Sequence, residues 1–196
     1  QFFALICNFE PKPDQKNNTG VQWLNLSDVV GSISAKEIIH QYLYQSKKNE
    51  LRWALKPVLI AWLLNNGLEK VIYTDCDIFF VNNPYFLLNE LNTHSVILTP
   101  HWQSIDPDKD DQLADTLATG YFNAGFIGVS QNGLPAMTWW AGACGYKMEK
   151  SPKTGFYDDQ RYLDIMPFEF DGVHVLQHRG CNLACWNMHV NKREII

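Results

Sequence analysis

Two acids separated by one residue, Asp75 and Asp77, directly follow an apolar segment of the chain. Residues 71–74 are Val-Ile-Tyr-Thr, and such β-branched and aromatic types predict a strand buried on both faces of a parallel sheet. Inside that strand the two carboxylates would point to opposite faces and be buried without partners. We therefore expect them at the carboxyl edge of the sheet, where open α/β folds bind ligands. There both carboxylates can bind one hard divalent cation, which in turn can neutralise a diphosphate.

A pair of acids at this spacing is common in protein sequences, and most such pairs are solvated loop residues or helix caps. The alternative interpretation of Asp75 and Asp77 is therefore a polar turn without a ligand. The apolar segment that precedes them favours a metal site.

Composition limits the classes of partner. The 196 residues are 46% hydrophobic, enough for one domain with a substantial core. The net charge of −5, without a basic block, predicts no binding of nucleic acid or of an anionic membrane. No 18-residue apolar run predicts a membrane span, and we expect no signal peptide in the first residues. The five scattered cysteines favour a reducing compartment, so we expect a cytoplasmic location.

Strand-like and helix-like segments alternate along the chain, which is typical of an α/β fold. In one expected helix Ser34 is the predicted N-terminal cap. We predict a single domain over residues 1–196, with a mostly parallel sheet and helices on both faces. The predicted strands cover residues 2–7, 71–74, 95–98, 122–129 and 173–176, and the predicted helices cover residues 35–42, 50–65, 84–91 and 134–145.

Four motifs follow one another in a recognisable order and spacing. They are Leu55-Lys56-Pro57, Tyr73-Thr74-Asp75-Cys76-Asp77, Phe122-Asn123-Ala124-Gly125-Phe126 and Asp159-Gln160. Taken together, they resemble the nucleotide-diphospho-sugar transferase superfamily, and most of all its retaining family-8-like branch. The resemblance covers nearly the whole chain and implies the glycosyltransferase A fold, a three-layer Rossmann-like architecture. Further segments resemble a bacterial subgroup of that branch: Thr99-Pro100-His101, Trp139-Trp140 and Asn182-Leu183-Ala184-Cys185-Trp186-Asn187.

The resemblance implies a metal-dependent retaining glycosyltransferase. Such an enzyme moves a hexose from a nucleotide-diphosphate sugar, here expected to be a UDP-sugar, to a saccharide or glycan acceptor. Asp75 would contact the ribose and share Mn²⁺ or Mg²⁺ with Asp77. The metal would stabilise the negative charge that develops on the diphosphate as the glycosidic bond breaks.

The resemblance also implies a set of donor-binding residues. Lys56 would lie near the donor, His101 would contact the transferred sugar, and Asn123, Ala124 and Gly125 would form the sugar-binding strand. An amide offers both a donor and an acceptor to sugar hydroxyls, and small neighbours let the donor approach the backbone. Without the resemblance, Lys56 is equally well a surface lysine, and Gly125 is a turn residue at a strand end.

Asp159 and Gln160 match the pair that, in this family, lies beneath the anomeric carbon of the donor sugar. Because glutamine is a poor nucleophile, we expect its amide oxygen to stabilise an oxocarbenium-like centre while Asp159 binds sugar hydroxyls. The alternative interpretation of this segment is a helix N-terminus that carries acids.

Two parts of the family pattern are missing, so we expect a partial domain. One is the first strand–helix unit that holds the base, and the other is a His-Phe-x-Gly-like motif that supplies a third metal ligand. A non-catalytic protein that binds carbohydrate or nucleotide sugar is therefore the alternative function. A nucleotidyltransferase is disfavoured, because the chain has no Gly-rich phosphate loop.

Overall fold

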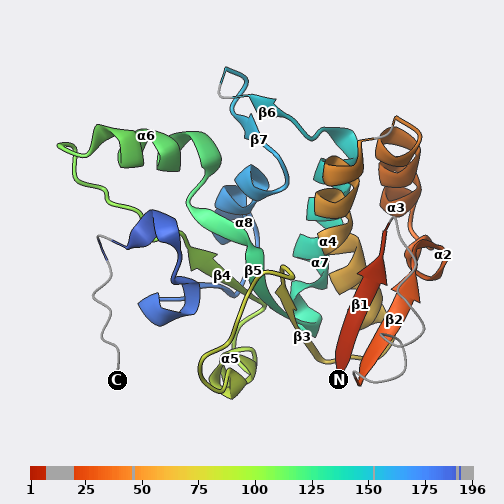
Figure 1. Ribbon diagram of the computed structural model, residues 1–196. Helices are drawn as coiled ribbons and strands as arrows, with labels where there is room; N and C mark the ends of the chain where they lie inside the picture. The colour runs from red at the N-terminus through yellow and green to blue at the C-terminus, as the bar shows by residue number, and fades with distance from the viewer. Residues whose placement is uncertain (8–19, 46, 152, 189, 191–196) are drawn as a thin grey trace.

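A mixed four-stranded sheet forms the centre of the computed structural model (Figure 1). The structure describes residues 1–7, 20–45, 47–151, 153–188 and 190. The strands of this sheet lie in the spatial order β3 (Lys70–Thr74), β5 (Phe122–Ser130), β4 (Val96–Pro100) and β8 (Val173–Val175).

The direction of β5 differs from the prediction. β4 and β8 pair in parallel, but β5 runs antiparallel to both β3 and β4, so the expectation of a mostly parallel sheet is wrong here. The reason is the connection from β4, which passes through α6 (Asp110–Thr119) and enters β5 at the edge where β4 ended. The amino end of β5 therefore lies beside the carboxyl ends of β3 and β4.

Two smaller sheets flank this one. β1 (Phe2–Ile6) and β2 (Val21–Asn25) pair in parallel, and β6 (Lys150–Ser151) and β7 (Phe156–Tyr157) form an antiparallel pair. The mixed α/β class is confirmed, and the strand predicted at residues 2–7 is present. β2 and the β6–β7 pair were not predicted.

Helices cover both faces of the four-stranded sheet, as predicted (Figure 1). On one face, α4 (Lys48–Asn65) and α7 (Leu134–Tyr146) pack on Ile127 of β5 and form the larger core. On the other, α5 (Tyr85–Glu90) packs on the adjacent residue Phe126. Consecutive strand residues point to opposite faces, so one strand supplies both cores.

The predicted helix at residues 35–42 begins earlier and is divided. The cap is Ser32 and not Ser34, because the Ser32 hydroxyl accepts a hydrogen bond from Ala35 N at 3.1 Å. Ser32 and Ser34 are both of a residue type that caps helices, and Ser32 is the one that makes the cap hydrogen bond. The helix then continues as α3 (Ile33–Ile38) and a π-helical turn, η1 (Ile39–Leu43).

α4 is the longest helix of the described residues and carries Lys56 toward the sheet. It passes through Pro57 without ending, although proline lacks the N–H that would bond to the preceding turn. The remaining short elements are α2 (Leu26–Val29), η2 (Gln131–Gly133), η3 (Gln160–Ile165), α8 (Met166–Glu169), η4 (Arg179–Asn182) and η5 (Cys185–Asn187).

Among the described residues, no helix combines the length and apolar character needed to cross a membrane. All five cysteines are free thiols.

Candidate active site

A buried lysine contacts residues of the other three sequence motifs. Lys56, on α4, is only 5% exposed, and its Nζ lies 3.3 Å from Asp75 Oδ1 and 3.2 Å from Asp159 Oδ2. The same nitrogen lies 3.4 Å from the backbone oxygen of Ala124. The interpretation of Lys56 as a surface lysine is therefore wrong, since the side chain is the shared counterion of two acids far apart in sequence.

The charges of this cluster do not cancel, because one ammonium group faces two carboxylates. Burial acts to lower the pKa of Lys56, but Asp159 and Asp75 outweigh it and raise the pKa, so the lysine stays protonated. Burial raises the pKa of Asp159 to about 6, against the lowering effect of Lys56. Apart from this ion pair, Asp159 Oδ2 has no hydrogen-bond partner among the described residues. The cluster therefore holds an acid that titrates near neutrality.

Asp75 lies one residue past β3 and is fixed by the sheet. Its backbone N–H donates to Gly125 O at 2.8 Å, and the Tyr73 hydroxyl donates to Oδ1 at 2.8 Å. Burial, with Asp75 beside it, raises the pKa of Tyr73, so the hydroxyl remains a donor. The predicted position of Asp75 at a strand end is confirmed, and Tyr73 is a supporting residue whose role was not predicted from the motif that contains it.

Asp77 lies in the turn that follows. Ile78 N donates to Asp75 O at 3.2 Å, which closes the turn, and Asp77 is exposed to solvent. Half-buried Asp75 and exposed Asp77 fit Mn²⁺ or Mg²⁺ in donor chemistry, since Mg²⁺ is commonly held by one or two carboxylates together with substrate phosphates. Among the described residues, no third acid, histidine or cysteine forms a metal-binding group with these two.

Gly125 marks a close approach of two chain segments and not a turn. It lies within β5, and a Cβ at this position would be 2.8 Å from Asp75 Oδ2 and 3.0 Å from Asn123 Oδ1. Its N–H donates to Asn123 Oδ1 at 2.8 Å. Glycine is therefore required by the space that the two polar side chains occupy.

Asn123 is held by a network of asparagines from the end of the chain. Its Nδ2 donates to Asn182 Oδ1 at 3.1 Å, and Asn182 Nδ2 donates to Pro100 O at 2.8 Å. Asn187 Nδ2 donates to His101 O at 2.8 Å. This network connects the start of β5 to the end of β4. Asn187 is a further positioning residue, and the asparagine-rich segment at residues 182–187 was its signal in the sequence.

Hydrogen bonds hold Asp159 to α7 and Gln160 to the last residue of α6. Trp140 Nε1 donates to Asp159 O at 2.8 Å. Gln160 Nε2 donates to Thr119 O at 3.0 Å, and its Oε1 accepts from Ala124 N at 3.4 Å. Asp159 is the N-cap residue of η3, so the segment is a helix N-terminus that carries acids, but Asp159 is buried there and contacts Lys56. Gln160 Oε1 keeps a second lone pair for a ligand.

His101 lies at the same edge of the sheet, one residue past β4, but no described contact joins its ring to the Lys56 cluster. Burial lowers the pKa of His101, and its ring meets Trp186 edge-on at 5.7 Å. Next to it is a cavity of about 280 Å³ that Trp102, Tyr121 and Arg179 help to line. A second cavity, of about 330 Å³, includes Trp186 in its wall.

Two proteins of Bacillus subtilis (strain 168) are similar to the chain. Uncharacterized protein YfnF is 30% identical over 189 residues, which cover 93% of the chain and 61% of YfnF. Uncharacterized protein YfnD is 32% identical over 158 residues, which cover 74% of the chain and 49% of YfnD. The chain thus spans about half to three-fifths of the length of these relatives. No protein-family model and no solved structure matches it significantly.

Proposed function

We propose that the chain is the catalytic part of a metal-assisted, retaining glycosyltransferase of the glycosyltransferase A fold. It would move a hexose from a UDP-sugar to a saccharide or glycan. The observation that carries this proposal is the convergence of Lys56, Asp75 and Asp159, which come from separate segments and meet within 3.2–3.3 Å. Asn123, Gly125 and Gln160 lie around that cluster through the hydrogen bonds described above.

In this proposal the polar groups at the sheet edge bind and orient the donor. Asn123 and Asp159 present oxygens to sugar hydroxyls, and Gly125 leaves room for the donor to reach the backbone. Lys56 holds both acids in place, so no reorganisation is needed as charge develops. The second lone pair of Gln160 Oε1 stabilises positive charge at the anomeric carbon.

Asp75 and Asp77 are the residues that would hold Mn²⁺ or Mg²⁺. When bound, the cation neutralises the diphosphate leaving group. The two cavities that Gln103 helps to line are candidate sites for the acceptor saccharide, since aromatic and polar side chains together suit a sugar. The free thiols fit a reducing, cytoplasmic compartment.

A second candidate function is the non-catalytic binding of a nucleotide sugar. One observation favours it: Lys56 already neutralises part of the charge of Asp75 and Asp159, which leaves these acids less free to bind a ligand.

Release of UDP from a panel of UDP-sugars, with Mn²⁺ and oligosaccharide acceptors, separates the two functions. A transferase releases UDP, and Asp77→Asn abolishes the metal-dependent release. Glu69→Gln is the matched control, because it removes an exposed acid at the opposite edge of the sheet. A binding protein would instead gain thermal stability from the donor without releasing UDP.

The role of Gln160 has its own test. Gln160→Ala should lower kcat by about 10-fold or more and change KM little, because the amide would act on the transition state. A rise in KM at unchanged kcat would contradict this role.

A further inference from the structure

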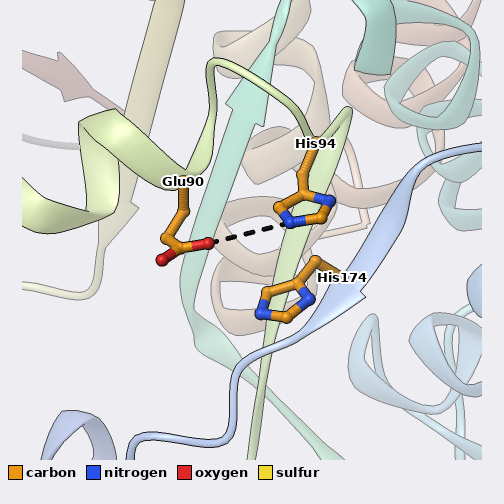
Figure 2. Close-up of side chains that lie close together, drawn as sticks. All are labelled: Glu90, His94 and His174. Atoms are coloured by element: carbon orange, nitrogen blue, oxygen red, sulfur yellow. Dashed lines mark ion pairs between the residues drawn. The ribbon is translucent and has the colours of Figure 1, made fainter.

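A second cluster of titratable side chains lies at the opposite edge of the four-stranded sheet (Figure 2). Glu90 Oε2 is 3.7 Å from His94 Nε2, and the rings of His94 and His174 stack with centroids 4.3 Å apart at an interplanar angle of 11°. One ligand atom from each of the three residues lies within 4.8 Å of the others.

The backbone positions of the three residues are fixed by secondary structure. His174 pairs with Ile97 across β8 and β4, on the face that α5 covers. His94 is one turn past Glu90, the last residue of α5, and its N–H donates to Glu90 O at 3.1 Å. Between the strands, Ser95 N donates to Gly172 O at 2.8 Å. Glu90 is thus the last residue of α5, His94 lies two residues before β4, and His174 lies within β8.

The side chains offer suitable ligand atoms. Each imidazole, of His94 and of His174, has a ring nitrogen that can bind a metal ion. The Glu90 carboxylate supplies a negative charge. The side chains of His94 and Glu90 are 31% and 41% exposed, so an ion can reach them from solvent.

We propose that Glu90, His94 and His174 form a binding site for a divalent transition metal of the Zn²⁺ type. Two imidazole nitrogens and one carboxylate oxygen are a ligand set that Zn²⁺ prefers, with a water completing the tetrahedron. Mg²⁺ and Ca²⁺ favour sites made only of oxygen, so the cluster differs in chemistry from the Asp75–Asp77 pair.

Binding requires a small rearrangement of the rings. Zn²⁺ bonds of about 2 Å in a tetrahedron place ligand atoms about 3.3 Å apart, close to the 3.7 Å between Glu90 and His94. The lone pair of an imidazole lies in the ring plane, so the parallel stack of His94 and His174 must open. The terminal ring torsion of histidine is broad, and rotation about it costs little.

A metal ion bound here would link α5 to β8. Glu90 belongs to α5, which follows the turn that carries Asp77, whereas His174 belongs to β8. The bound ion would therefore stabilise the packing of α5 on the sheet edge. This site is independent of the proposed transferase function.

Calorimetric titration of the chain with Zn²⁺, combined with thermal unfolding, tests the site. We expect a single ion per chain and a rise in Tm of about 5 to 10 °C when Zn²⁺ exceeds its Kd about 100-fold. His94→Gln and His174→Gln should each weaken binding about 10-fold or more, since the loss of even an outer-shell partner of a metal ligand has an effect of this size. His40→Gln, which removes an exposed histidine elsewhere, should not. No binding by the unaltered chain, or equal binding by all three variants, would overturn the proposal.

Thiols are the competing ligands, because Cys181 Sγ lies 3.6 Å from His178 Nδ1. Co²⁺ used in place of Zn²⁺ distinguishes the two sites by its spectrum. Ligation by nitrogen and oxygen gives no thiolate charge-transfer band, and Cys181→Ser leaves binding unchanged. A thiolate band, or loss of binding in Cys181→Ser, would assign the metal to the cysteine and refute the site at Glu90, His94 and His174.

Discussion

The two titratable clusters of this molecule lie at opposite edges of one sheet and differ in burial and in how their charged groups are paired. At the carboxyl edge, Lys56 is 5% exposed and forms ion pairs with two acids, so their negative charge is partly neutralised inside the protein. At the amino edge, Glu90, His94 and His174 are half-exposed, and two of the three groups are imidazoles.

The difference shows how burial sets the use of polar groups. A buried ion pair is expensive to break, because each partner left alone is an uncompensated charge in a low-dielectric interior. The buried cluster therefore maintains a fixed geometry, to which a ligand must conform. A half-exposed histidine pair remains accessible to solvent, so a metal ion can reach it without breaking a buried ion pair.

Removal of the buried cation should have the largest effect. Lys56→Met leaves Asp75 and Asp159 without their shared counterion, and we expect a loss of about 3 to 5 kcal/mol in the free energy of unfolding. Lys36→Met, at an exposed position of α3, is the control and should change it by less than about 0.5 kcal/mol. Denaturant unfolding measures both, and equal losses would mean that Lys56 contributes no buried ion pair.

The stability of the carboxyl-edge cluster should depend on pH through Asp159. Its pKa of about 6 in the folded protein exceeds the ordinary value of 3.8, so between pH 4 and 6 the folded state retains a proton that the unfolded chain has released. The free energy of unfolding contributed by this group therefore falls as pH rises through that window, by up to about 3 kcal/mol. Asp159→Asn should flatten the decline relative to the unaltered chain. An unchanged slope would place the pKa of Asp159 near its ordinary value.

Crowding at Gly125 tests how tightly the same cluster is packed. The Cβ in Gly125→Ala would lie 2.8 Å from Asp75 Oδ2, so Asp75 must shift from its partners, at a cost of about 1 to 3 kcal/mol. Gly31→Ala is the control, because its Cβ would meet nothing within 4 Å. If the two variants unfold at the same denaturant concentration, β5 and Asp75 are far enough apart to accept a Cβ at position 125.

The amino-edge cluster should respond least. In metal-free protein, His94→Gln removes a partly exposed pair with Glu90, and we expect a change of about 0.5 kcal/mol in the free energy of unfolding. The same unfolding measurement with a chelator present checks it. A loss above about 2 kcal/mol would show that the imidazoles stabilise the fold without a metal.

The helices and strands that follow strong hydrophobic patterns were predictable. α4, α7 and β5 lie within a few residues of their predicted bounds, because each is a long, strongly apolar segment. The direction of β5 was not predictable, since an apolar strand pattern is the same in either direction and the path of the connection decides it. The prediction of Ser34 as the helix cap was wrong for a similar reason, because Ser32 and Ser34 are both residue types that cap helices.

The candidate site was likewise predictable only in part. Asp75 and Asp77 were both expected at the edge of the sheet as ligands of one cation, and the structure places Asp75 half-buried against Lys56 and Asp77 exposed in a turn. The local sequence around Asp75 and Asp77 does not show which of the two carboxylates contacts Lys56, because that lysine lies 19 positions before Asp75. His174 gave no signal at all, because its partners precede it by about 80 residues.

The sequence by itself determined which residues are chemically able to act, since residue type and local spacing are written in the chain. It also set the class of fold through the alternation of apolar patterns. Only the tertiary structure decided that Lys56 serves two acids and that Gly125 makes room for Asp75. It likewise decided that Glu90 and His94 meet His174. The physical reason is that burial and long-range proximity arise from the packing of whole elements, which no short segment specifies alone.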